Sequence, residues 1–177
     1  MSRLTEIDEH APDVADTLAQ IKQASGSRQL PNVHKALAHS PPLLKAWQPF
    51  FNVVRRDFQL SGRHRELVIL RVAALNGSGY SFSAHIDIAL REGVTQEQID
   101  ILGQGLVPPG LDDGERAIVA YTDAITRSVS VTDGEFAAVR THLGERATVE
   151  LTGLVAAYNM QTRFVLALGV ETDAKPD

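Results

Sequence analysis

Apolar residues recur every three or four positions along this chain and almost nowhere alternate over the length of a strand. That spacing is the period of an α-helix, which gathers such residues on one face. Three residue pairs have the spacing of a capping box, which opens a helix: Thr95 with Gln98, Asp112 with Glu115, and Thr132 with Glu135. We therefore predict an all-α fold.

The helix signals also give approximate boundaries. A chain of 177 residues suits one domain, so we expect a single helical domain over 1–177, with a core motif region at about 40–125 and C-terminal helices within 112–170. Ser61 and Gly77 are expected to flank one helix. The segment RATVELTGLVAAYNMQTRFVLAL predicts a last long helix that ends at Gly169, followed by ETDAKPD as a frayed tail.

Two helices are expected to be buried on most faces. In ELVILRVAAL the apolar residues run nearly all the way round, so Arg71 within it should have a carboxylate or carbonyl partner. The C-terminal helix is similar, with Asn159 and Arg163 among apolar neighbours. So much buried helix surface in a small domain predicts a homo-oligomer: a dimer, trimer or hexamer.

Charge and composition exclude several classes of function. The net charge is −5 and the basic residues are scattered, which argues against nucleic acid as a partner. The chain has no cysteine, so disulfides and thiolate chemistry are absent. The N-terminus is not a secretory signal and the apolar runs are too short to span a bilayer, so we expect no membrane partner and a cytoplasmic location.

The segment RHRELVILRVAALNGSGYSFSAH holds the candidate site residues. Ser81 and His85 lie four apart, on one helix face, and Ser78 lies at the helix N-terminus, where unpaired N–H groups favour an anion. Glu66 begins the preceding helix, and its carboxylate reaches this face only at some helix crossing angles. Tyr80 is a candidate pocket residue because it is adjacent.

Several of these residues also have a possible purely structural role. Ser78 can be an ordinary helix cap, Ser81 a small residue at a helix contact, and His85 a buried histidine bonded to Glu66. Ser81 as a hydrolase nucleophile would need a strained turn or a triad. The other histidines show no HxxxH or HxxE grouping, so we expect no metal site and no cofactor.

The spacing Glu66-x11-Ser78-x2-Ser81-x3-His85 resembles the E-x11-C-x2-C-x3-H signature of alkyl hydroperoxidase D, with serine at both cysteine positions. The stretch from RHRELVILRV to EGVTQEQIDIL is similar to the carboxymuconolactone decarboxylase domain, and the likeness covers roughly residues 30 to 170. This resemblance implies an AhpD-like, all-α oligomer. It places Ser81 at the peroxidatic position, Ser78 at the resolving position, and Glu66 with His85 in a proton relay.

The serines decide which chemistry the resemblance can carry over. A serine hydroxyl ionises far less readily than a thiol and forms no disulfide, so dithiol peroxidase activity is excluded. A peroxidase name assigned through family membership would therefore contradict the sequence. The decarboxylase branch needs an anion site and a proton donor instead. His85 could act as general acid/base with Glu66, and Ser78, Ser81 and Tyr80 could bind substrate or oxyanion. The sequence thus favours proton-transfer chemistry on a small-molecule substrate with a carboxylate or carbonyl group, either decarboxylation by a lyase or isomerisation. The alternative is a non-catalytic oligomeric or ligand-binding relative.

Overall fold

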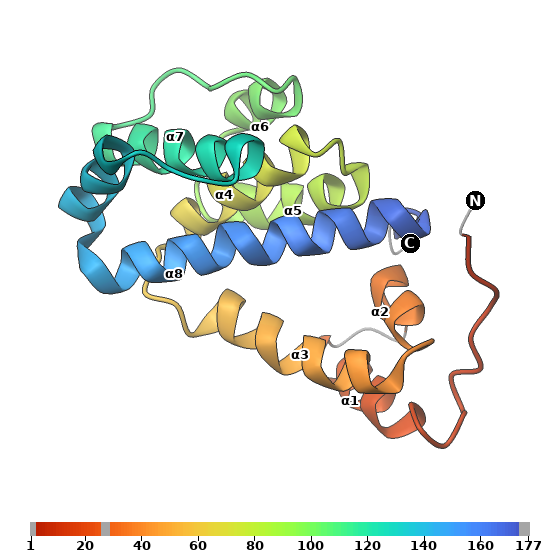
Figure 1. Cartoon of the computed structure of the whole chain (residues 1–177). Coiled ribbons are helices and arrows are strands. Elements are labelled where there is room, and N and C mark those ends of the chain that lie inside the picture. The colour runs from red at the N-terminus through yellow and green to blue at the C-terminus, as the bar shows by residue number, and fades with distance from the viewer. Residues whose placement is uncertain (1–2, 26–28, 174–177) are drawn as a thin grey trace.

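The structure, a computed structural model, describes residues 3–25 and 29–173, which form eight α-helices and no strand (Figure 1). The all-α prediction is confirmed. The helices are α1 (Ala15–Ser25), α2 (Asn32–Leu37), α3 (Pro41–Arg56), α4 (Gly62–Leu75), α5 (Gly79–Arg91), α6 (Gln96–Gly103), α7 (Asp113–Ser128) and α8 (Asp133–Leu168). None of these helices is long and apolar enough to cross a membrane.

Helix α4 is the centre of the packing. It contacts α5, α6, α7 and α8, and its segment 66–73 is buried throughout, as the nearly continuous apolar pattern predicted. Arg71 donates from Nε and Nη2 to the two carboxylate oxygens of Asp123, at 2.6 and 2.7 Å, and from Nη1 to the carbonyl of Leu106 at 2.9 Å. The expected carboxylate and carbonyl partners are therefore both present. They offset the cost of burying a guanidinium.

Helix α8 consists of two helical segments joined at Gly144. The backbone there has φ 75° and ψ 173°, a conformation that side chains other than hydrogen strongly disfavour. A capping box between Thr132 and Glu135 opens the first segment, and Gly169 ends the second in the left-handed region. This agrees with the sequence, which predicted one helix start at Thr132 and a separate long helix ending at Gly169.

Helix α3 runs along one side of α8, with α1 and α2 gathered near its N-terminal end (Figure 1). Its aromatic residues join it to α8. The Trp47 ring lies 4.9 Å from that of Phe51 and 5.1 Å from that of Phe164, between ring centroids. Phe51 in turn meets Tyr158 edge-on at 5.8 Å. These contacts fix α3 beside the C-terminal half of α8.

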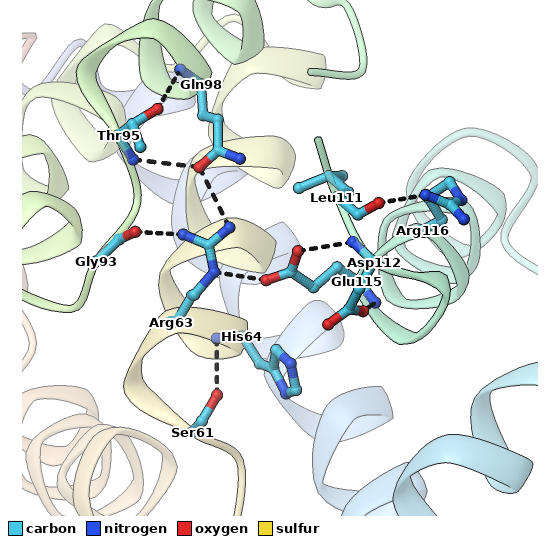
Figure 2. Close-up of polar contacts among 10 residues, drawn as sticks. All are labelled: Ser61, Arg63, His64, Gly93, Thr95, Gln98, Leu111, Asp112, Glu115 and Arg116. Carbon is cyan, nitrogen blue, oxygen red and sulfur yellow. Dashed lines mark hydrogen bonds and ion pairs between the residues drawn. The ribbon is translucent and has the colours of Figure 1, made fainter. Parts of the chain in front are cut away.

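Arg63, in the first turn of α4, ties together the starts of two other helices (Figure 2). Capping boxes open both of them, as predicted: Thr95 with Gln98 at α6, and Asp112 with Glu115 at α7. The guanidinium donates to Glu115 at 2.5 Å, to the amide oxygen of Gln98 at 3.2 Å, and to the carbonyl of Gly93. We call this group the Arg63 cluster.

The prediction of a frayed C-terminal tail is wrong for residues 171–173. Asp173 accepts hydrogen bonds from the backbone N–H of Asn32 at 2.6 Å and from the hydroxyl of Tyr80 at 2.9 Å. The side chain of Asn32 also donates to the carbonyl of Glu171 at 3.2 Å. Local sequence gave no sign of this because the partners lie far away in the chain. Residues 174–177 are outside the described part.

Candidate functional site

Glu66 and His85 are in contact. Glu66 lies in the second turn of α4 and His85 in the middle of α5, and the packing of these helices brings Oε2 of Glu66 to 2.7 Å from Nδ1 of His85. Both residues are buried, with 2% and 6% of their surface exposed. Because a carboxylate can only accept, Nδ1 carries the proton, and the other ring nitrogen of neutral His85 is an acceptor.

The hydrogen-bond chain continues on both sides of this pair. The hydroxyl of Tyr158, from α8, lies 3.2 Å from Nε2 of His85 and accepts a bond from Nε of Arg55 at 3.1 Å. On the other side, Nε of Arg65 donates to Oε1 of Glu66 at 3.3 Å. A continuous chain therefore runs from Arg55 through Tyr158, His85 and Glu66 to Arg65, with a guanidinium at each end. We call it the Glu66 chain.

Tyr158 supplies a proton to this chain rather than a negative charge. Its side chain is completely buried. Burial raises the pKa of Tyr158, and the positive charge of Arg55 only partly opposes that effect. The hydroxyl is consequently protonated at neutral pH and donates to Nε2 of His85. The distance of 3.2 Å is long for such a bond, so it is the weakest link to the imidazole.

A pocket of about 360 Å³ opens beside this chain. Its wall combines the predicted pair Glu66 and His85 with residues of α2, α3, α8 and the C-terminal segment. Besides that pair, it is lined by Pro31, Val33, His34, Arg55, Arg56, Arg65, Tyr80, Ala84, Ile88, Gln161 and Asp173. A cleft of this size that holds a few convergent polar groups is suited to a small molecule.

Ser78 and Ser81 are not among the residues that line the pocket. Ser78 caps α5 by accepting the backbone N–H of Ser81 at 3.4 Å, and its hydroxyl donates to that of Ser81 at 3.2 Å. At most 1% of either residue is exposed. No hydrogen bond joins Ser81 to His85 in the part of the chain that the structure describes. The capping role is thus visible, and the substrate or oxyanion role stays a prediction.

Tyr80 lines the pocket, as its position next to the motif suggested. Its hydroxyl donates to Asp173 at 2.9 Å and accepts the backbone N–H of Val33 at 3.3 Å. Burial raises the pKa of Tyr80, and the negative charge of Asp173 raises it further. Tyr80 is therefore a neutral polar group that joins α5 to α2 and to the C-terminal segment.

Sequence reasoning missed Tyr158, Arg55 and His34. Tyr158 had a usable signal, because it is a polar residue in the apolar run LVAAYNM and a buried hydroxyl normally needs a partner. Arg55 and His34 had none, since nothing in VVRRDF or PNVHKAL separates them from surface residues. Groups of three or more metal-binding side chains are not found among the described residues.

Comparison with known structures identifies the fold. An uncharacterized peroxidase-related protein from Ralstonia eutropha JMP134, described as an alkylhydroperoxidase AhpD core, matches with a TM-score of 0.84 at 19% identity, over 98% of this chain and 93% of that one. A peroxidase-related protein from Silicibacter sp. TM1040 gives 0.83 at 20% identity, over the same shares. The protein therefore has the AhpD-like helical fold.

A third similar structure has a small molecule bound. It is a cysteine-to-alanine variant of the debrominase Bmp8 in complex with 2,3,4-tribromopyrrole, with a TM-score of 0.79 at 19% identity, over 98% of this chain and 95% of that one. Residues 41–124 match the carboxymuconolactone decarboxylase family. No curated protein gives a significant match. The resemblance to the carboxymuconolactone decarboxylase and AhpD-like superfamily, with serine at both motif cysteine positions, is thereby confirmed.

Proposed function

We propose that this protein catalyses proton transfer on a small carboxylated or carbonyl substrate, as a decarboxylase or an isomerase, with His85 as general acid/base. The observation that carries the proposal is the buried Glu66 chain, which borders a pocket of about 360 Å³. A carboxylate that fixes the histidine tautomer, beside a space for a substrate, is a recurring arrangement for acid–base catalysis.

Each group in the chain has a distinct task in this proposal. Glu66 holds the proton on Nδ1 of His85 and stabilises the imidazolium that forms when Nε2 takes a proton. The substrate displaces the Tyr158 hydroxyl from Nε2, because that is the weakest bond to the ring. Tyr158 remains held by Arg55. In isomerisation, Nε2 takes a proton from one carbon and returns it to another.

Decarboxylation uses the same groups in the opposite protonation state. The carbon–carbon bond to the carboxylate breaks, carbon dioxide leaves, and the electron pair moves into the conjugated carbonyl as an enolate. The imidazolium of His85 then gives its proton to carbon. Arg55 lines the pocket, and its Nη groups suit the enolate oxygen or a second carboxylate. Thiol chemistry has no place in this scheme, because the chain has no cysteine.

A hydrogen–deuterium exchange assay tests the proposal. A panel of small unsaturated lactone acids and keto acids in D₂O is followed by proton NMR for loss of the acidic C–H signal and by ¹³C NMR for carbon dioxide and bicarbonate. We expect turnover with at least one member. It should fall about 10²–10⁴-fold in His85→Ala and in Glu66→Gln. His64→Ala is the matched control, because His64 lies on α4 with Glu66 but lines a different pocket.

The outcomes separate the enzyme from its alternative. Exchange that survives in His85→Ala would refute the general acid/base role. Binding of panel members without exchange or carbon dioxide release would instead favour the non-catalytic ligand-binding relative. That alternative gains support from the structure in one respect, since both ring nitrogens of His85 already have partners within the chain.

A further inference from the structure

His34 lines the pocket and has one buried ring nitrogen without a hydrogen-bond partner. It lies on α2, with 8% of its surface exposed, and lines the same pocket as Glu66 and His85. Its Nε2 is 2.8 Å from the amide oxygen of Gln48 on α3. The other ring nitrogen, Nδ1, is buried without a hydrogen-bond partner, and no other buried side-chain nitrogen or oxygen among the described residues lacks one.

The contact with Gln48 sets the chemical character of that free nitrogen. An amide oxygen only accepts, so Nε2 of His34 carries the proton and Nδ1 presents a lone pair. Burial lowers the pKa of His34, and the charge of Arg55 lowers it further, against the opposing effects of Gln48 and Asp173. The ring is therefore neutral at pH 7, and Nδ1 is a hydrogen-bond acceptor.

Leaving such an atom unpaired is costly. A buried polar group without a partner costs about 1–3 kcal/mol, so a group of this kind calls for an explanation. If the ring of His34 faced only apolar side chains, Nδ1 could have no partner. The ring instead lines a pocket, where a ligand can supply the missing hydrogen-bond donor.

The charges on the pocket wall indicate what else that ligand carries. Besides the histidines, three cations and two anions line the pocket: Arg55, Arg56 and Arg65, and Glu66 and Asp173. Arg65 is paired with Glu66, and Asp173 is occupied by Tyr80 and by a backbone N–H. Arg56 is exposed at the pocket. The arginines thus exceed the carboxylates by one, in a protein whose net charge is −5.

We propose that the pocket binds a carboxylate that also bears a hydroxyl or N–H group, which donates a hydrogen bond to Nδ1 of His34 while an arginine binds the carboxylate. His34 would then be a specificity-determining residue. This inference rests on the proposed function, and it narrows the substrate class to hydroxy or amino carboxylates. A site built to bond a donor discriminates against an analogue that lacks it, because its own polar atom is then left unpaired.

Matched ligand pairs test the inference. The affinities of 2-, 3- and 4-hydroxybenzoate are compared by calorimetry with those of the corresponding fluorobenzoates, which have no donor. We expect at least one hydroxybenzoate to bind about 10–100-fold more tightly than its fluoro partner. The preference should vanish in His34→Phe and persist in His39→Phe, because His39 lines a different pocket.

A second measurement keeps the test independent of how well His34→Phe folds. In the unsubstituted protein labelled with ¹⁵N-histidine, the preferred hydroxybenzoate should shift the Nδ1 resonance of His34 in the direction of a hydrogen-bonded acceptor. Equal affinities within every pair, an unmoved Nδ1 resonance, or binding of no benzoate would each overturn the inference. The proposed function is tested separately by the exchange assay described above, so failure of this inference would not refute it.

Discussion

The Arg63 cluster and the Glu66 chain both include residues from the first two turns of α4, and they differ in what their polar groups do. The Arg63 cluster is closed: its guanidinium donates to three acceptors, which belong to two capping boxes and the turn before α6 (Figure 2). The Glu66 chain is open: it borders a pocket that is also lined by His34, whose buried Nδ1 has no hydrogen-bond partner. Saturated groups hold helices in place, whereas unsatisfied groups beside a cavity indicate a ligand.

The largest expected effect is on the closed cluster. Arg63→Leu leaves the buried carboxylate of Glu115 without its cation, since that side chain is only 6% exposed. We expect the free energy of unfolding to fall by about 3 kcal/mol. Urea denaturation followed by circular dichroism measures it. Arg116→Leu is the control, because its ion pair with Asp113 is exposed and its loss should change stability very little. Equal effects of the two substitutions would contradict the closed-cluster description.

The second prediction compares the two buried glutamates directly. In Glu115→Gln an amide N–H₂ must face either Arg63 or the backbone N–H of Asp112, both of which are donors, so we expect a loss of about 2 kcal/mol. In Glu66→Gln the amide oxygen can keep the bond to His85, and only Arg65 must move, so we expect about 1 kcal/mol. Parallel urea titrations give both values. The reverse order would indicate that Glu66 mainly stabilises the fold.

The third prediction concerns the hydroxyl of Tyr158. Tyr158→Phe leaves Nε of Arg55 and Nε2 of His85 unpaired, and we expect a loss of about 1 kcal/mol in the free energy of unfolding. Tyr121→Phe should cost less, because its partner Thr152 keeps a bond to the carbonyl of Thr148. If the Tyr121 variant proves the less stable one, then the Tyr158 hydroxyl contributes little to the Glu66 chain.

The smallest effect is a dependence of stability on pH. The pKa of His34 is lowered in the folded protein, so between the ordinary value of about 6.5 and its folded value the unfolded chain binds more protons. Folding stability should therefore fall as the pH drops below about 6.5. Urea midpoints are compared at pH 7.5 and 5.5, and the wild type should lose more stability between these two values than His34→Phe does. Parallel pH profiles would mean that His34 titrates normally.

The sequence was most informative where structure is decided locally. The three capping boxes, the Ser61 and Ser78 caps and the separate helices around Gly144 all depend on residues within a few positions of one another. The burial of Arg71 could also be foreseen, because its own helix is apolar on nearly every face. Such features need no knowledge of how the helices cross.

The candidate site was only partly accessible from the sequence. Spacing and resemblance selected Glu66 and His85, but their contact at 2.7 Å depends on how α4 and α5 pack. Tyr158 lies 73 positions from His85, and Arg55 lies 103 positions from Tyr158, so no local pattern joins them. The homo-oligomer and the cytoplasmic location stay predictions.

The aromatic contacts of α3 give the protein an optical reporter of its own site. Trp47 is the single tryptophan of the chain, and its indole stacks on Phe51, whose ring meets Tyr158. Tyr158 in turn touches the imidazole of His85. If a ligand displaces the tyrosine hydroxyl as proposed, it disturbs this series of rings at one end, and we expect the fluorescence of the indole at the other end to change. Trp47 fluorescence is then a test of pocket occupancy that needs no attached dye.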